Sequence, residues 1–153
     1  MKTGWSVRWA VPVDADGGPV ALPADGVSAV AHAPTPTDEP LGEPALLLAS
    51  FPLSPDRRHV APGPLTDFLV DRAADVYAGL LPGLPAGSGL LGLVPGPVGR
   101  GELDARLARA IVDRLPEVAF LPAADAAAAR IRPRDAVLLA GGTPALAEWL
   151  APV

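Results

Sequence analysis

The sequence predicts an α+β fold in which an early antiparallel or mixed sheet is packed by helices on one face. Residues 5–13 alternate between apolar and polar side chains, the pattern of a half-buried strand. Apolar side chains recur at helical spacing over 64–81 and again over 102–115. The order along the chain is strands, helix, strand, helix, strands, helix, and this order is typical of an α+β fold.

The chain before the first helix is expected to supply most of the sheet. Pro12 places the strand over 5–13 at a sheet edge or near its own end, because proline cannot donate a ladder hydrogen bond. Residues 45–53 form the most apolar run and are expected to be a central strand. The other expected elements are, in order, a turn at 14–18, a short returning strand at 19–22, a strand at 27–33 and a polar loop at 35–44.

Two amphipathic helices are expected to cover this sheet. Pro64 suits a first helical turn, where its missing N–H is not needed, and the Leu-Pro-Gly sequence at 81–83 ends the helix. Glu102 and Asp104 favour the positive dipole end of the second helix. The apolar positions are Leu65, Phe68, Leu69, Ala73, Val76, Tyr77 and Leu80 in the first helix, and Leu103, Leu107, Ala110, Ile111 and Leu115 in the second.

The chain is expected to form two parts, a sheet-plus-helix core over 1–83 and a smaller α/β continuation over 84–153 that packs on it. The run at 123–129 is Ala-rich, and helix and hairpin connection both remain open for it. The other expected elements of the second part are a linker at 84–89, strands at 90–94, 118–121 and 136–139, and a last helix from Thr143-Pro144 through Trp149.

Composition excludes several classes of function. The chain has 17 acidic and 12 basic residues and a formal net charge of -5, which argues against a nucleic-acid or anionic-membrane surface. The absence of cysteine excludes disulfides, thiolate metal sites and cysteine nucleophiles. No apolar run approaches the roughly 20 residues of a spanning helix, and no signal-peptide core is present. We therefore expect a cytoplasmic protein that binds neither nucleic acid nor membrane.

Motifs of common catalytic and cofactor sites are weak in this sequence. Residues 87–92 match G-x-G-x-x-G, but they follow a helix instead of a strand, so a flexible linker is the favoured interpretation. His32 and His59 show no metal-ligand spacing, and Ser50 and Ser54 lack the strand–turn–helix elbow of a hydrolase. The adjacent Asp38 and Glu39 are expected to point apart and stay solvated, as is usual in an exposed loop.

The pair Arg57-Arg58 stands out, because it follows the most apolar run and precedes the first helix. Taken alone, the residues favour a solvated pair that bonds to nearby carboxylates such as Asp56 and Asp67. The alternative is phosphate recognition, since planar guanidinium groups fit phosphate oxygens and can stabilise charge on a transferred γ-phosphoryl group.

The stretch from Pro44 to His59, with Ser-Pro-Asp-Arg-Arg at 54–58, resembles the segment that follows the ATP-binding domain in sacsin-like, heat-shock-chaperone-like GHKL ATPases of actinobacteria. The helix over 64–81 and the sequence RPRDAVLL at 132–139 also look like these proteins. The resemblance implies a middle or transducer segment with a left-handed βαβ crossover. It also implies an arginine, Arg57 or Arg58, that reaches the γ-phosphate bound by a neighbouring domain.

The chain departs from this family in lacking the nucleotide pocket. Neither the Asp-x-Gly-x-Gly loop nor the Gly-rich lid is found in the sequence. The resemblance therefore implies that ATP and Mg²⁺ are bound by a separate ATP-binding domain, and that this chain holds no cofactor and hydrolyses no ATP alone.

Three functional hypotheses remain open at the level of sequence. The first is a transducer-like segment of a chaperone-type ATPase, in which Arg57 and Arg58 are candidate γ-phosphate contacts. The second is a stand-alone protein-interaction module whose arginines pair with a partner's carboxylates. The third is a small enzyme with a pocket around Asp56, Arg57 and His59, for which no spacing specifies a reaction.

Overall fold

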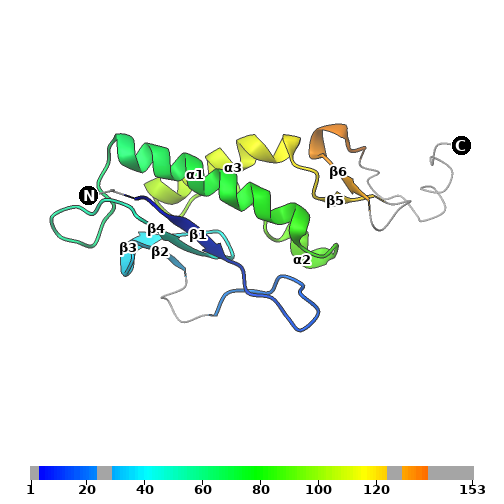
Figure 1. Cartoon of the computed structure of the whole chain (residues 1–153), viewed down its shortest axis with the longest axis horizontal. Helices are drawn as coiled ribbons and strands as arrows, with labels where there is room; N and C mark the ends of the chain where they lie inside the picture. Colours follow the sequence, from blue (N-terminus) through cyan, green and yellow to red (C-terminus); the bar gives the residue numbers. More distant parts are fainter. Residues whose placement is uncertain (1–3, 24–28, 124–128, 138–153) are drawn as a thin grey trace, which may run out of the picture.

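A four-stranded mixed sheet forms one layer of the molecule, and helices cover one of its faces (Figure 1). The computed structural model describes residues 4–23, 29–123 and 129–137. The strands are β1 (Val7–Ala10), β2 (Val30–His32), β3 (Pro36–Pro40) and β4 (Leu46–Ala49), and their order in the sheet is β1-β4-β2-β3. β4 pairs antiparallel with β1 and parallel with β2, whereas β3 is antiparallel to β2. The predicted α+β class is confirmed.

β1 is an edge strand whose alternation matches the prediction. Val7 and Trp9 are half-buried, and the residues between and after them are exposed. The Trp9 indole N–H donates to the carbonyl of Ala73 at 2.9 Å, and its ring meets Tyr77 edge-on at 4.8 Å between centroids. The face of β1 that carries Val7 and Trp9 is therefore the face that packs against the first helix.

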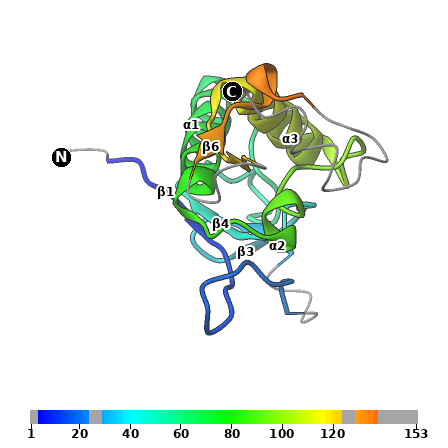
Figure 2. The ribbon, with the colours of Figure 1, turned by 90° about the vertical axis from the view of Figure 1, so that its right-hand side faces the viewer.

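The two long helices, α1 (Pro64–Leu80) and α3 (Glu102–Arg114), confirm the predicted helical periodicity. They lie on the same side of the sheet, as Figure 2 shows from the end of the molecule. Leu69 and Tyr77 of α1 share one buried cluster with Leu47 of the sheet and Leu107 of α3. Arginine–aspartate pairs also join the helices, with Arg114 between Asp71 and Asp75, and Arg106 on Asp67.

The outer side of α1 differs from the prediction. Leu65, Phe68 and Val76 were expected on the apolar face, but they are 49%, 40% and 39% exposed. The buried face instead uses smaller residues, including Ala73 and Ala74. Together with Leu69, Val70 and Tyr77 they form the buried face, and small side chains allow the helix to approach its neighbours closely.

Two local predictions were wrong. The polar segment expected as a loop over 35–44 contains β3, because Thr37 is buried and its hydroxyl donates to the Ala31 carbonyl at 2.7 Å. The strand expected over 90–94 is instead the short helix α2 (Ser88–Leu91) followed by a turn. Leu90 and Leu93 are both buried, so this apolar run reaches the core by helical spacing.

The later part of the chain contains short elements. They are the 3₁₀ turns η1 (Leu81–Gly83), η2 (Leu115–Glu117) and η3 (Pro133–Asp135), and the antiparallel pair of β5 (Leu121–Pro122) and β6 (Arg130–Ile131). The strand predicted over 118–121 is found only at its end. The first two residues of the strand predicted over 136–139 are irregular. The remainder of that strand and the last helix, 143–149, lie outside the described residues.

The connections in the sheet differ from those that the family resemblance implies. The parallel neighbours β2 and β4 are linked through β3, and α1 follows the last strand of this sheet. No left-handed βαβ crossover is therefore found among residues 4–23, 29–123 and 129–137. No helix in this described part is long and apolar enough to cross a membrane.

Candidate functional site

The arginine pair lies at the tip of a pinned hairpin-like loop, residues 52–61, which we call the arginine loop. Leu53 and Val60 form an isolated antiparallel bridge at its base. The Ala61 N–H donates to the Pro52 carbonyl at 2.8 Å, below this bridge. The Ser54 N–H donates to the His59 carbonyl at 2.9 Å, nearer the tip. These contacts hold the two arms of the loop together and project residues 55–58 outward.

Asp56 organises the tip of the arginine loop from within. Its Oδ1 accepts the N–H groups of Arg58 and His59 at 2.8 and 3.3 Å, and its Oδ2 lies 2.9 Å from His59 Nδ1. The Arg58 N–H bond, followed by the His59 side chain, lowers the pKa of Asp56 to about 2. The same side-chain hydrogen bond raises the pKa of His59 above its usual value.

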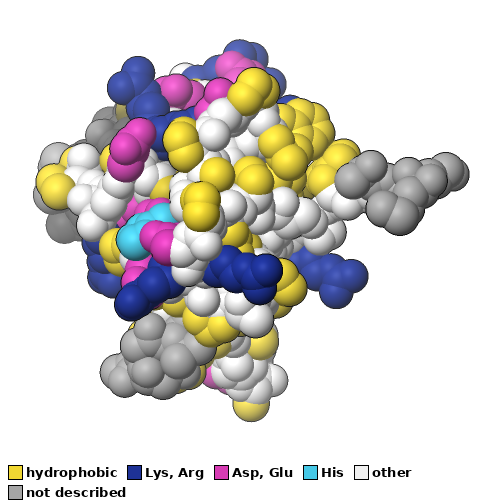
Figure 3. Space-filling view, turned by 90° about the vertical axis from the view of Figure 1, so that its left-hand side faces the viewer, with side chains coloured by type: hydrophobic (Ala, Val, Ile, Leu, Met, Phe, Trp, Pro, Cys, Tyr) yellow, Lys and Arg dark blue, Asp and Glu magenta, His cyan; other side chains and the backbone are white. Residues whose placement is uncertain are grey.

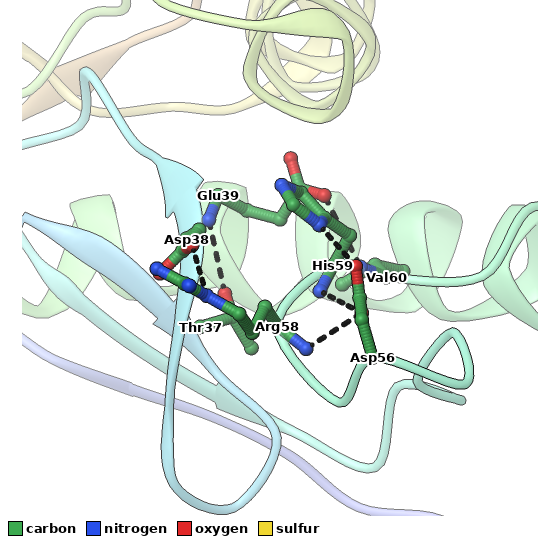
Figure 4. A network of polar contacts seen from close by, with 7 residues as sticks. All are labelled: Thr37, Asp38, Glu39, Asp56, Arg58, His59 and Val60. Carbon is green, nitrogen blue, oxygen red and sulfur yellow. Dashed lines mark hydrogen bonds and ion pairs between the residues drawn. The ribbon is translucent and has the colours of Figure 1, made fainter.

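β3 anchors the arginine loop from outside (Figure 4). The Asp38 N–H donates to the Arg58 carbonyl at 2.7 Å, and the Arg58 Nε donates to Asp38 Oδ2 at 2.7 Å. One residue further, Glu39 Oε1 accepts the Val60 N–H at 3.1 Å. The expectation that Asp38 and Glu39 simply stay solvated is corrected by these contacts, because each carboxylate holds one side of the loop.

The two arginines therefore have different surroundings. Arg58 is paired with Asp38, whereas the Arg57 guanidinium has no hydrogen bond or ion pair within the described residues. Arg57 is also the one residue other than glycine in the described part with a positive φ, 58°. Its side chain lines an open pocket of about 550 Å³ together with Thr35 and Ser54. The structure thus makes Arg57 the arginine available for a ligand and Arg58 the one that holds the loop.

The arginine loop projects from the end of the molecule that Figure 3 faces, where basic, acidic and histidine side chains lie close together. No family model, curated protein or solved structure matches this chain. A function for this surface is therefore inferred from the sequence and the structure of the chain alone.

The other residues singled out from the sequence do not assemble around the arginine loop. His32 is in β2, in register with Leu48 of β4. The Ser50 hydroxyl lies 3.0 Å from the Ser6 hydroxyl, and no hydrogen bond joins a serine hydroxyl to the His59 imidazole in the described residues. The G-x-G-x-x-G run at 87–92 contains α2 and is preceded by a 3₁₀ turn instead of a strand. Within the described ranges, no three His, Asp or Glu residues are grouped to hold a metal ion.

A second polar cluster was missed by sequence reasoning. Glu43, between β3 and β4, is 2% exposed, and Asp104, in the first turn of α3, is 1% exposed. Burial, followed by the charge of Asp104, raises the pKa of Glu43 to about 8. Asp104 was interpreted as a residue that favours the helix dipole, and Glu43 lies in the segment expected to be a loop. No local sequence signal connects the two positions.

Proposed function

We propose that this chain is a transducer-like segment of a chaperone-type ATPase of the cytoplasm, coupling nucleotide state to the binding of a partner or client. In this proposal Arg57 contacts the γ-phosphate held by a neighbouring ATP-binding domain. The observation that carries the proposal is the Arg57 guanidinium, unpaired within the described residues, at the tip of a loop that three backbone and side-chain contacts to β3 hold in place.

The geometry of the loop suits a γ-phosphate contact for two reasons. A guanidinium presents a fixed fork of donors that matches phosphate oxygens and remains charged at every physiological pH. A loop that is already ordered loses little conformational entropy when a partner's phosphate binds. The arginine–phosphate contact can therefore stabilise the negative charge that develops in the transition state of phosphoryl transfer. Arg58 then serves as a positioning residue through Asp38.

ATP and Mg²⁺ belong to the separate domain in this proposal. In this proposal Arg57 would place one positive charge against the γ-phosphate. The arginine loop would then transmit the presence of the phosphate to β3. The sheet and α1 would in turn carry the change to the partner or client surface.

The proposal is tested in the native ATPase assembly that contains the chain. An antibody against residues 54–71 identifies this assembly by its size in source cells and allows its purification. Arg57→Ala should lower the kcat for ATP hydrolysis by roughly 10³-fold while the Kd for ATP changes little, because the contact acts on the transition state. Arg58→Ala should have a smaller effect on kcat.

Arg109→Ala is the matched control, since Arg109 is a surface arginine whose ion pair among the described residues is with Asp113 of the same helix. Its ATPase activity should equal that of the wild type. An Arg57→Ala variant with unchanged turnover, or an antibody that recovers only a 15.5 kDa polypeptide without ATPase activity, contradicts the proposal.

A second candidate is a stand-alone protein-interaction module, and the outer side of α1 favours it. Trp5 is 52% exposed and meets Phe68 edge-on at 5.0 Å, and Leu65, three residues before Phe68 in α1, is also exposed. Exposed aromatic residues beside one another are enriched at protein interfaces. Recovery of a stoichiometric partner without ATPase activity, and its loss in a Phe68→Ser variant, would select this candidate.

A further inference from the structure

The buried carboxyl pair of Glu43 and Asp104 joins two parts of the chain that lie far apart in sequence. Glu43 belongs to the connection between β3 and β4, and Asp104 belongs to the first turn of α3. Gly42 passes so close that a Cβ built there would lie 3.2 Å from Asp104 Oδ2. The pair therefore forms the contact between this connection and the amino-terminal end of α3.

Asp104 is the member of the pair whose oxygens accept hydrogen bonds from two backbone donors of other residues. Asp104 Oδ1 accepts the Gly42 N–H at 2.7 Å, and Oδ2 accepts the Arg100 N–H at 2.6 Å. The position in the first helical turn also favours a negative charge, because the helix dipole is positive there. Both oxygens of Asp104 are thus used by backbone donors.

Glu43 has fewer donors than Asp104, since the one backbone group that bonds to its carboxyl group is its own N–H. Its Oε2 is buried and has no hydrogen-bond partner among the described residues, and the rest of its carboxyl group interacts with the side chain of Asp104. Two ionised carboxylates in contact without water repel each other strongly, so the pair keeps one proton on Glu43. The other charged or titratable groups that face Glu43 are Arg100, whose positive charge opposes this effect, and Tyr77 of α1, whose hydroxyl donates to the Leu93 carbonyl.

We propose that this pair is a proton-controlled latch, in which the first turn of α3 and the β3–β4 connection separate with release of the Glu43 proton to solvent. While the latch is closed, the proton lies between the two carboxyl groups. When it opens, Glu43 reaches water and ionises, and Asp104 no longer accepts the Gly42 N–H.

The latch is connected to the arginine loop through β3. Glu43 follows β3 by three residues, and β3 carries Asp38 and Glu39, which hold Arg58 and Val60. Opening of the latch therefore loosens the connection that follows the strand anchoring the arginine loop. The latch itself does not depend on the proposed ATPase role, since its contacts lie entirely within this chain.

Proton linkage fixes the direction of the effect. The pKa of Glu43 is about 8 in the closed state and 4.5 when the residue is solvated, so the open state binds fewer protons between these values. The closed state is therefore most stable below about pH 4.5, and opening becomes about tenfold more frequent for each pH unit up to about pH 8.

Amide hydrogen exchange of the full chain tests the proposal. Between about pH 5.5 and about pH 8, the protection factor of the Gly42 amide, whose hydrogen bond crosses the latch, should fall by about 100-fold or more, after correction for the intrinsic exchange rate. Glu43→Gln should abolish this fall, because the neutral amide donates to Asp104 at every pH. Glu102→Gln is the control, since Glu102 is in the same helical turn but is exposed, and it should behave as the wild type.

A wild-type chain whose protection factors do not change with pH, or a Glu43→Gln variant that loses protection as the wild type does, overturns the latch. If Glu43→Gln fails to fold, the ¹³C chemical shift of the Glu43 carboxyl group in the wild type decides the question. A midpoint near pH 8 supports the latch, and a midpoint near the solvated value of 4.5 refutes it.

Discussion

Replacing Arg57 with glycine should stabilise the fold while removing its candidate phosphate contact. Arg57 has φ 58°, in the left-handed region that residues with a Cβ adopt at a cost and glycine adopts freely. A residue held in such a conformation costs roughly 1–2 kcal/mol, and strain of this kind is concentrated at functional sites. Arg57→Gly removes that cost.

The expected gain is smaller than the strain itself. Glycine also loses more backbone freedom on folding than other residues, which costs roughly 0.5–1 kcal/mol. The free energy of unfolding should therefore rise by about 0.5 kcal/mol in Arg57→Gly. No hydrogen bond or ion pair of the Arg57 side chain in the described residues offsets this gain.

Arg58→Gly is the matched comparison at the adjacent position. Arg58 does not have a positive φ, and its Nε bonds to Asp38 at 2.7 Å on the surface. This variant gains no relief of strain and loses an exposed pair, so it should lower the free energy of unfolding by about 1 kcal/mol. Urea denaturation measures both variants against the wild type, and an Arg57→Gly variant at least as destabilised as Arg58→Gly would refute the reasoning.

Two further predictions concern side-chain hydrogen bonds, one in the core and one within the arginine loop. Tyr77→Phe removes a buried hydroxyl that donates to the Leu93 carbonyl at 2.7 Å, and it should lower the free energy of unfolding by about 1–2 kcal/mol in urea denaturation. Asp56→Asn removes the main cause of the raised pKa of His59, so the imidazole should titrate at lower pH in an NMR titration. In the wild type, the His59–Asp56 attraction is fully present below the ordinary histidine pKa of 6.5 and is lost as pH rises through the raised pKa of His59. If the midpoint of the His59 titration is the same in Asp56→Asn as in the wild type, this contact is contradicted.

The parts of the fold that were predicted correctly have strong local periodicity. β1 alternates with a period of two, and α1 and α3 repeat apolar residues at helical spacing over several turns. β3 has no such pattern, since it is a polar edge strand whose place depends on a buried Thr37 and on pairing with β2. The run over 90–94 is too short for its apolar residues to distinguish a strand from a helix.

The sequence identified the two arginines of the candidate site but did not distinguish their roles. The sequence places Arg57 and Arg58 side by side, but only the backbone φ of Arg57 and the contact of Arg58 with Asp38 distinguish their roles. The Glu43–Asp104 pair could not be predicted, because its partners are 61 positions apart and meet only when β3 and α3 are packed. Long-range polar contacts of this kind leave no periodic signal in the sequence.

The order of the strands has a consequence for synthesis on the ribosome. β1 leaves the ribosome first, but its strand partner is β4 and its indole donates to Ala73, 64 positions later. At translation rates of about 5–20 residues per second, roughly 3–13 seconds pass before that acceptor exists. The nascent β1 has no strand partner until β4 has been made, and its tryptophan stays uncovered until Ala73 has been made. Exposed surfaces of this kind are recognised by chaperones and aggregate readily. Trp9 can therefore be covered only after α1 has been made, although β4 is available earlier to pair with β1.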